Sequence, residues 1–192
     1  LLNRSSDLRR SLGAFGDLTA AAWYHDGVHY CLENGLMRGV SGGKFLPDGS
    51  TTRAQLVTIL WRLEGNPAPV SAAGFSDVAD GVWYAEAVRW AADSGVVRGY
   101  ADGRFRPNDA VTREQMAAIL YRYAQYKGYD VTKKADLSGY SDNGQVSAYA
   151  KDALAWANAA KLINGVTNTT LAPQGNATRA QVSVMLHRFL TM

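Results

Sequence analysis

The sequence lacks the residues on which several classes of protein depend. Among its 192 residues there is a single cysteine, Cys31, which excludes an internal disulfide framework and any cysteine-rich zinc module. No run of 18 apolar residues occurs, so no segment has the length of a hydrophobic membrane span. Lys and Arg number 20 against 17 Asp and Glu, a net charge of +3 without a basic run. This charge pattern argues against an extended nucleic-acid surface.

Catalytic signatures are also missing. The sequence has no G-x-S-x-G, no Walker loop and no G-x-G-x-x-G, and its glutamates form no repeating carboxylate pair, so no residues support an enzyme, a resident cofactor or a catalytic site. With 47% hydrophobic and 19% charged residues, the chain can bury a core of one or two domains. No secretory signal is visible at Leu1, and we expect the chain to be a mature piece of a larger protein.

What the sequence does contain is one unit in three copies. Phe15-Gly16-Asp17-Leu18 returns sixty positions later as Phe75-Ser76-Asp77-Val78, and Thr52-Arg53-x-Gln55 returns as Thr112-Arg113-x-Gln115. A looser copy opens at Tyr140-Ser141-Asp142, carries one extra residue before its first helix, and closes at Thr178-Arg179-x-Gln181. We therefore expect repeats at 15–65, 75–128 and 140–190 that together form one domain, with 1–14 as an N-terminal extension that either forms a short helix or ends a preceding domain.

Each copy predicts two helices around a glycine-rich loop. The first helix is expected near 21–34, 82–94 and 148–160, and the second begins after a threonine whose partner is a glutamine three residues on, which is a capping box. The second helices carry apolar stripes at helical spacing: Leu56, Ile59, Leu60 and Leu63; Met116, Ile119, Leu120 and Tyr123; Val182, Met185, Leu186 and Phe189. Packing these stripes together predicts an all-α, mainly helical fold with loop-rich turns, in a pseudo-threefold arrangement around a central helical bundle.

Each copy has an arginine at a helix position where a positive charge is unfavourable. Arg53, Arg113 and Arg179 fall at the first position of the second helix, where the helix dipole opposes a cation by roughly 0.3–1 kcal/mol. One interpretation is an anion site made of helix N–H groups and a guanidinium fork. The other is a structural ion pair with Asp17, Asp77 or Asp142. The sequence leaves both open.

Aromatic and histidine residues near the first helix allow further interpretations. Trp23, Trp83 and the matching Tyr149 either stack on a sugar or belong to the core, and the usual burial of tryptophan favours the core. His25 and His29 have metal-ligand spacing, but the second copy has Ala85 and Arg89 there, so we expect no metal site.

These residues resemble a known family. From Phe75 to Gln115 the pattern Phe-Ser-Asp-Val…Trp-Tyr…Ala-Val-x-Trp-Ala…Gly-Val-Val-x-Gly-Tyr-x-Asp-Gly-x-Phe-x-Pro-x-x-x-Val-Thr-Arg-Glu-Gln is similar to an S-layer homology (SLH) repeat. The resemblance covers residues 15–190 as three tandem repeats. It implies a three-lobed helical prism with grooves between repeats, and non-covalent anchoring of an exported protein at the bacterial cell surface, in the cell wall or S-layer.

The resemblance also implies a ligand and the residues that bind it. The ligand is a secondary cell-wall polysaccharide, often with a pyruvylated amino sugar, and no nucleic acid or membrane insertion is expected. The matching arginines would bind its carboxylate, the aspartates would bind hydroxyls or orient the arginine, and Lys44 and Arg104 would add charge. The expected site residues are Arg53, Arg113, Arg179, Asp17, Asp77, Asp142, Trp23, Trp83, Lys44, Arg104, Gly39 and Gly99. A structural or protein-interaction array with little glycan binding remains the alternative.

Three departures from the family pattern bear on the grooves. The glutamate that usually ends Thr-Arg-Ala-Glu is glutamine in every copy, at Gln55, Gln115 and Gln181. The third copy replaces Gly-x-Phe-x-Pro by residues 169–173, Thr-Thr-Leu-Ala-Pro, and places Lys161 where the other copies have glycine. We therefore expect the groove that uses the third loop to be weaker or altered, and one or two grooves to dominate binding.

Overall fold

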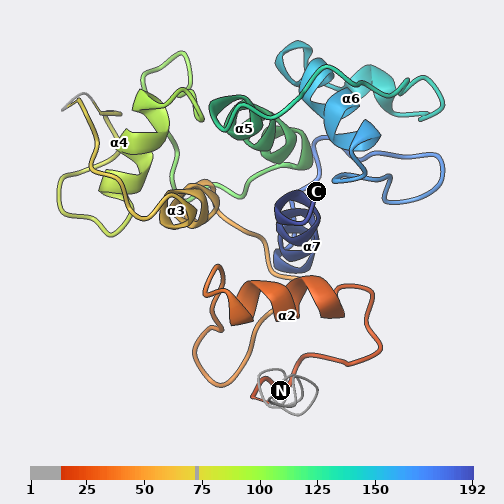
Figure 1. Cartoon of the computed structure of the whole chain (residues 1–192), viewed down its shortest axis with the longest axis horizontal. Coiled ribbons are helices and arrows are strands. Elements are labelled where there is room, and N and C mark those ends of the chain that lie inside the picture. Colours follow the sequence, from red (N-terminus) through yellow and green to blue (C-terminus); the bar gives the residue numbers. More distant parts are fainter. Residues whose placement is uncertain (1–13, 72–73) are drawn as a thin grey trace. The chain divides into compact units, whose positions relative to one another are not determined.

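A computed structural model describes residues 14–71 and 74–192 (Figure 1). Residues 1–13 lie outside this range, so the expectation for the N-terminal extension falls almost entirely outside the described residues. The chain divides into two compact units: one holds the residues up to Ser50 together with Thr178–Met192, and the other holds Thr51–Ala177.

The described residues form α-helices and short 3₁₀ turns, and they contain isolated β-bridges but no strand. This confirms the predicted all-α class. In chain order the elements are α2 (His25–Glu33), α3 (Arg53–Leu63), α4 (Ala85–Asp93), α5 (Arg113–Tyr126), the 3₁₀ turns η1 (Asn143–Gln145) and η2 (Ala148–Ala150), α6 (Lys151–Ala159) and α7 (Arg179–Leu190). No helix among the described residues is long and apolar enough to cross a membrane.

The predicted capping boxes are present at all three second helices. At α3 the Thr52 hydroxyl accepts a hydrogen bond from the Gln55 backbone N–H at 3.2 Å, and the Gln55 side chain accepts one from the Thr52 N–H at 2.9 Å. The helices α5 and α7 begin with the same reciprocal pair. Two backbone N–H groups at each helix start are thereby satisfied. This explains why the threonine and glutamine pattern predicts where these helices begin.

The first helices begin later than the sequence predicted. Residues 21–24 and 82–84 form turns, and α2 and α4 begin at His25 and Ala85. None of the first helices has a side-chain cap, and the segment before α2 closes through i→i+3 bonds, such as Ala22 N–H to the Thr19 carbonyl at 3.0 Å. A helix start without a capping side chain tightens into 3₁₀-like turns.

Helices pair between copies rather than within them. The first helix of the second copy, α4, packs on α3 of the first copy, and α6 of the third copy packs on α5 of the second. In the other unit α2 packs on α7, so the first copy meets the last (Figure 1). At that contact a Cβ on Gly27 would lie 2.7 Å from the Val184 Cα, so the close approach requires glycine. Each pair therefore joins two copies of the repeat.

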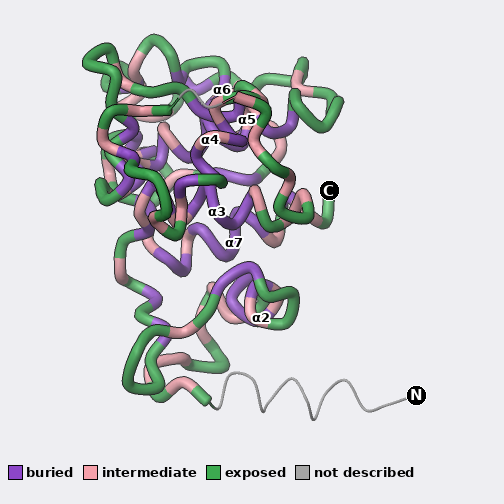
Figure 2. Tube along the Cα trace, turned by 90° about the vertical axis from the view of Figure 1, so that its left-hand side faces the viewer, coloured by how far each residue is buried: buried purple, intermediate pink, exposed green. Residues whose placement is uncertain are grey.

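The apolar stripes of the second helices supply much of the buried core. All four stripe residues of α5 and all four of α7 are buried, as are Leu56, Ile59 and Leu60 of α3. Buried stretches alternate along the chain with exposed loops, as Figure 2 shows. Burial of one leucine-sized side chain contributes roughly 1.5–3 kcal/mol, so burial of the stripes stabilises the fold.

Three equivalent residues join in a closed ring of backbone hydrogen bonds. Val111 donates to the Thr51 carbonyl at 2.9 Å, Thr51 donates to Ala177 at 3.1 Å, and Ala177 donates to Val111 at 2.8 Å. Each residue directly precedes the capping threonine of one copy, so the three copies meet here in a locally threefold way. The full prism with its central helical bundle stays a prediction.

Candidate functional site

The three repeated arginines are buried, and their guanidinium groups donate to backbone carbonyls. Arg53 Nε lies 2.8 Å from the Phe105 carbonyl, Arg113 Nε lies 2.8 Å from that of Leu171, and Arg179 Nε lies 2.7 Å from that of Phe45. A second donor, Nη2, reaches the carbonyls of Arg98, Asn164 and Arg38 respectively. Each arginine thus fixes a loop of another copy through two hydrogen bonds.

Both sequence interpretations of these arginines need correction. The described residues contain no ion pair between any of them and Asp17, Asp77 or Asp142. The helix N–H groups proposed for an anion are occupied as well, because at α3 the Arg53 N–H donates to the Asp109 carbonyl and the Ala54 N–H to that of Pro107, each at 3.0 Å. The same bonds recur at α5 and α7. Only guanidinium groups remain to meet an anion.

The aspartates fix the same loops from the opposite side. Asp77 accepts the backbone N–H groups of Phe105 and Arg106, both at 2.8 Å. Asp17 does the same for Phe45 and Leu46, and Asp142 for Leu171 and Ala172. The N–H of Phe105 therefore bonds Asp77 while its carbonyl bonds Arg53, so the aspartate orients the arginine through the loop.

The loop of the third copy keeps this geometry without its aromatic ring. Asp142 bonds the Leu171 and Ala172 N–H groups at 2.8 and 2.7 Å, and Ala172 has the same left-handed backbone (φ 48°) as Arg106 (φ 58°). Leu171 is buried in the position that Phe105 takes in the second copy. Arg53 lies over the Phe105 ring at 4.7 Å, and Leu171 offers Arg113 no such ring.

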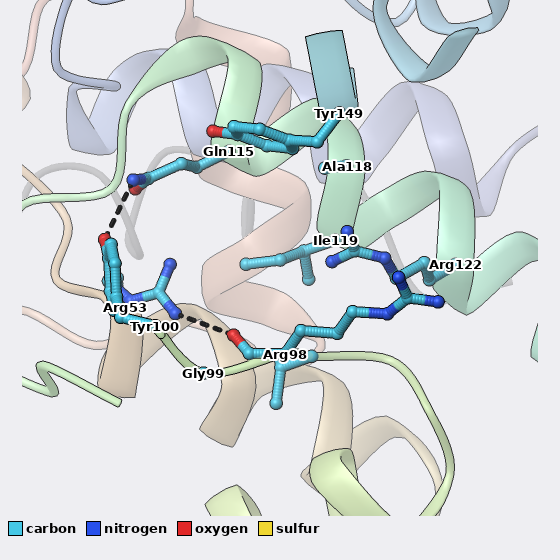
Figure 3. A pocket seen from close by; sticks show the side chains of 10 residues that line it. Arg53, Arg98, Gly99, Tyr100, Gln115, Ala118, Ile119, Arg122 and Tyr149 are labelled. Carbon is cyan, nitrogen blue, oxygen red and sulfur yellow. Dashed lines mark hydrogen bonds between the residues drawn. The ribbon is translucent and has the colours of Figure 1, made fainter. Parts of the chain in front are cut away.

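A cavity of about 270 Å³ lies within the unit Thr51–Ala177 and gathers residues from all three copies (Figure 3). Its lining contains three guanidinium groups, from Arg53, Arg98 and Arg122, and no carboxylate. Val97, Ala118 and Ile119 supply apolar surface, and Gly99, Tyr100, Gln115 and Tyr149 complete the lining. The cavity is thus a cationic recess with apolar and aromatic walls.

The positive charges in this cavity act on one another. Burial, and then the charge of Arg98, lower the pKa of the Arg122 guanidinium, and Arg53 contributes further. Burial also lowers the pKa of Arg53. In Figure 3 the terminal nitrogen of Arg53 that does not bond Arg98 points into the space below Gln115 and Tyr149. Like charges gathered at a partly dry surface are relieved by a bound anion, since an opposite charge offsets their repulsion.

The aromatic wall is held by hydrogen bonds. Gln115 donates from Nε2 to the Tyr100 hydroxyl at 3.0 Å while its oxygen caps α5. The Tyr149 hydroxyl donates to Glu114 Oε1 at 3.2 Å, and burial raises the pKa of that hydroxyl. Arg53 lies 5.0 Å from the centre of the Tyr100 ring, a cation–π distance. Both rings are therefore fixed in place relative to the cationic groups.

The predicted tryptophans are exposed, which overturns their assignment to the core. The exposed fraction of Trp23 is 67% and that of Trp83 is 61%, and each ring packs edge-on against the following tyrosine. Neither lines the described cavity, where Tyr149 takes the matching place in the third copy. Turn residues, rather than helix, carry these rings, so they are not directed into a helix interface.

Other predicted site residues lie in the loops. Lys44 and Arg104 are exposed and do not line the cavity. A Cβ on Gly39 would overlap the Phe15 ring and one on Gly99 the Phe75 ring, so both positions require glycine for packing, although Gly99 also lines the cavity. The described residues contain no cluster of three or more metal-binding side chains, and the His29 ring instead faces Glu33 at 3.2 Å.

Sequence reasoning missed Arg98, Arg122, Tyr100 and the lining role of Gln115. A signal for two of them was present, because Arg38 matches Arg98, and Arg62 and Arg188 match Arg122. Helical spacing also places Arg122 on the side of α5 that carries Gln115 and Ile119, since residues three and four apart share a face. Basic residues that recur at these positions were therefore an available signal for the cavity, in addition to the arginine after the capping threonine.

Comparison with known proteins identifies the repeats. The family model described as S-layer homology domain matches residues 14–57, 74–117 and 139–183. The amylopullulanase of Thermoanaerobacterium thermosulfurigenes is 34% identical over 175 residues, which cover 88% of this chain and 9% of that protein. The cellulosome-anchoring protein of Acetivibrio thermocellus is 27% identical over 165 residues, covering 81% of this chain and 35% of that protein.

A third relative has the same partial overlap. The surface-layer 125 kDa protein of Lysinibacillus sphaericus is 29% identical over 169 residues, which cover 85% of this chain and 14% of that protein. The chain thus spans between 9% and 35% of the length of these three relatives. The matched segments contain, in all three copies, the arginine that follows the capping threonine and the loop that precedes it. The chain therefore belongs to the S-layer homology family and carries three tandem copies of its domain.

Proposed function

We propose that this chain is a non-catalytic anchoring module that binds an anionic secondary cell-wall polysaccharide, one with a pyruvylated amino sugar, in the cavity of Arg53, Arg98 and Arg122. Membership of the S-layer homology family places the module at the bacterial cell surface. The relatives named for cellulosome anchoring and for the surface layer support anchoring of a larger protein. In this proposal, the module anchors the rest of the larger protein of which this chain is a part.

One observation carries the proposal: the cavity holds three guanidinium groups and no carboxylate. A pyruvate ketal on a sugar presents one carboxylate, one methyl group and a rigid ring. The guanidinium groups suit the carboxylate, because arginine binds carboxylates through paired donors. Ile119, Val97 and the tyrosine rings suit the methyl group and the apolar face of the sugar.

The alternative is a structural or protein-interaction array in surface-layer assembly. Its support is that the repeated arginines already serve the fold, because two carbonyls occupy each of them. The deciding residues are therefore those without such a structural role. Arg122 is the best of these, since it is half-buried on α5, lines the cavity, and its substitution removes no hydrogen bond to a backbone carbonyl that Arg53 makes.

Co-sedimentation with cell walls tests the proposal. The chain should pellet with native sacculi and stay in solution with sacculi from which acid-labile polysaccharide has been extracted. Arg122→Ala should lower the affinity about tenfold, the loss of one charge-assisted contact. Lys133→Ala, which removes an exposed charge away from the cavity, should bind like the wild type. Equal pelleting with extracted walls, or equal binding by both variants, contradicts the proposal.

The glutamine that replaces the family's glutamate gives a second test. Gln115→Glu keeps an oxygen for the capping box but places a negative charge at the cavity wall, so binding should weaken several-fold, about 3- to 10-fold for a partly solvated charge. Gln55→Glu makes the same change at the capping box of α3. Gln55 does not line this cavity. Equal effects of the two substitutions would place the carboxylate-binding groups elsewhere.

A further inference from the structure

A buried carboxylate beside the cavity has partners from two stretches of the third copy. Glu114, at the second position of α5, is 2% exposed. Its Oε2 accepts the Ser147 backbone N–H at 2.9 Å, and its Oε1 accepts the Ser147 hydroxyl at 2.7 Å, Gln174 Nε2 at 2.8 Å and the Tyr149 hydroxyl at 3.2 Å. No cation is needed to hold this carboxylate, because four donors and the helix N-terminus satisfy it.

This network occurs at one of the three equivalent helix starts. The first and third copies have Ala54 and Ala180 where the second has Glu114. The partners come from two places where the third copy departs from the repeat. Ser147 lies in the segment with the extra residue, and Gln174 directly follows residues 169–173, which replace Gly-x-Phe-x-Pro. Features that seemed to weaken a groove thus build a set of hydrogen bonds beside the cavity.

We propose that Glu114 is a positioning residue that fixes Tyr149 as a wall of the cavity and so makes this cavity a pre-organised glycan site. This inference rests on the proposed function. Tyr149 is half-exposed and would otherwise sample several rotamers, while its bond to Glu114 selects one. Because its hydroxyl proton is directed at Glu114, the ligand meets the ring of Tyr149 rather than a free hydroxyl donor.

The expected effect is moderate and measurable. Ordering one aromatic side chain during binding costs an amount equivalent to about threefold to tenfold in affinity. Glu114→Ala should therefore lower affinity by that factor without touching a guanidinium group. Alanine is already the residue at this helix position in two copies, so α5 tolerates it. Glu86→Ala, which removes an exposed first-turn carboxylate from α4, is the matched control.

A double-mutant cycle separates positioning from general stability. The affinity of the full chain for the methyl glycoside of 4,6-pyruvylated N-acetylmannosamine is measured by calorimetry for the wild type, Glu114→Ala, Tyr149→Ala and the double variant. If Glu114 acts through Tyr149, the double variant binds no worse than Tyr149→Ala alone. Losses that multiply, or a Glu114→Ala variant with wild-type affinity, overturn the inference.

A second readout needs no ligand. In protein labelled with ¹³C in its tyrosine rings, relaxation of the Tyr149 ring should report more motion in Glu114→Ala than in the wild type or Glu86→Ala. If the wild type binds neither the glycoside nor native walls, the proposed function fails, and ring relaxation alone decides whether Glu114 holds Tyr149. Unchanged ring motion in Glu114→Ala overturns the inference even where the wild type binds.

Discussion

The loops of the second and third copies have the same backbone but different surroundings. In both, an aspartate accepts two successive N–H groups, a left-handed residue follows, and an arginine of the preceding copy donates to the loop carbonyl. They differ around that arginine. Arg53 meets Tyr100 and Phe105, whereas the matching positions beside Arg113 hold Val166 and Leu171.

The comparison separates the residues that define the loop from those that line the cavity. Backbone hydrogen bonds to one carboxylate and one guanidinium define the loop, so the third copy keeps its shape although it has lost the Gly-x-Phe-x-Pro pattern. Arg53 belongs to both sets, whereas other residues that line the cavity vary between copies, since Arg98 corresponds to Asn164 and Tyr100 to Val166 in the third copy. Loop geometry is thus shared by the second and third copies, while the pair Arg98 and Tyr100 in the cavity lining has no counterpart in the third copy.

The largest expected effect sharpens the functional side of this comparison. Arg53→Ala should lower binding to native walls by about 10- to 100-fold, since the guanidinium faces the cavity beside two others. Arg113→Ala should cost less binding, because Asn164 and Val166 stand where the cavity has Arg98 and Tyr100. Co-sedimentation with native sacculi measures both, and thermal melts verify that each variant is folded. Equal losses would remove the distinction between the copies.

The next largest effect concerns the hydrogen bonds by which an aspartate holds the loop in both copies. Asp77→Ala and Asp142→Ala should each lower the free energy of unfolding by about 2 kcal/mol, because two backbone N–H groups lose their acceptor. The two losses should be alike, since the two carboxylates make the same bonds. Urea unfolding measures them, and Asp130→Ala, which affects only the neighbouring Thr132, should change little. A much smaller loss at Asp142 would mean that the third loop is held by other contacts.

Acid should remove the contribution of Asp142. The Leu171 N–H bond, with that of Ala172 and the charge of Arg113, holds the pKa of Asp142 below its ordinary value of 3.8. A depressed folded-state pKa adds stability above the unfolded pKa, and this stability is lost as the pH falls through the folded value. The stability difference between wild type and Asp142→Asn should therefore shrink from pH 6 to pH 2.5. A constant difference in urea unfolding contradicts this account.

The smallest expected effect lies at the end of α6, the first helix of the third copy. Lys161 has a left-handed backbone (φ 58°) where the second copy has Gly95 (φ 73°). Lys161→Gly should raise the free energy of unfolding by about 0.5–1 kcal/mol, because glycine adopts this conformation without a steric cost. Gly95→Lys should have the opposite sign. Thermal unfolding of the two variants measures both, and a loss of stability in Lys161→Gly would show that the lysine side chain compensates the strain.

Local signals in the sequence predicted the second helices and failed for the contacts of the arginines. A capping box needs four consecutive residues, so Thr52 and Gln55 identify the start of α3 without knowledge of the fold. The acceptors of Arg53 are carbonyls of Phe105 and Arg98, about fifty residues away, and every residue has a carbonyl, so no residue type reveals them. The sequence pointed to the aspartates as partners because they recur in all three copies and carry the opposite charge.

The exposure of the tryptophans could not be predicted for a similar reason. Whether Trp83 is predicted to be buried depends on whether the first helix of the second copy begins at Val82 or at Ala85. No capping residue marks the later start. The cavity itself required the arrangement of three copies, since Arg53, Arg122 and Tyr149 come from different ones. The family resemblance supplied the expected kind of ligand, and the structure supplied the residues that form the recess.

The pairing of α2 with α7 has a mechanical consequence. A row of repeats in which each contacts only its neighbours can be peeled apart from one end under tension, copy by copy. Here the helix of the first copy is seated on that of the last, with Gly27 against Val184 and the Cys31 thiol directed at the Ser183 carbonyl. A force that separates the first copy from the last therefore acts on a contact between segments 152 residues apart in the sequence, that of Cys31 with Ser183.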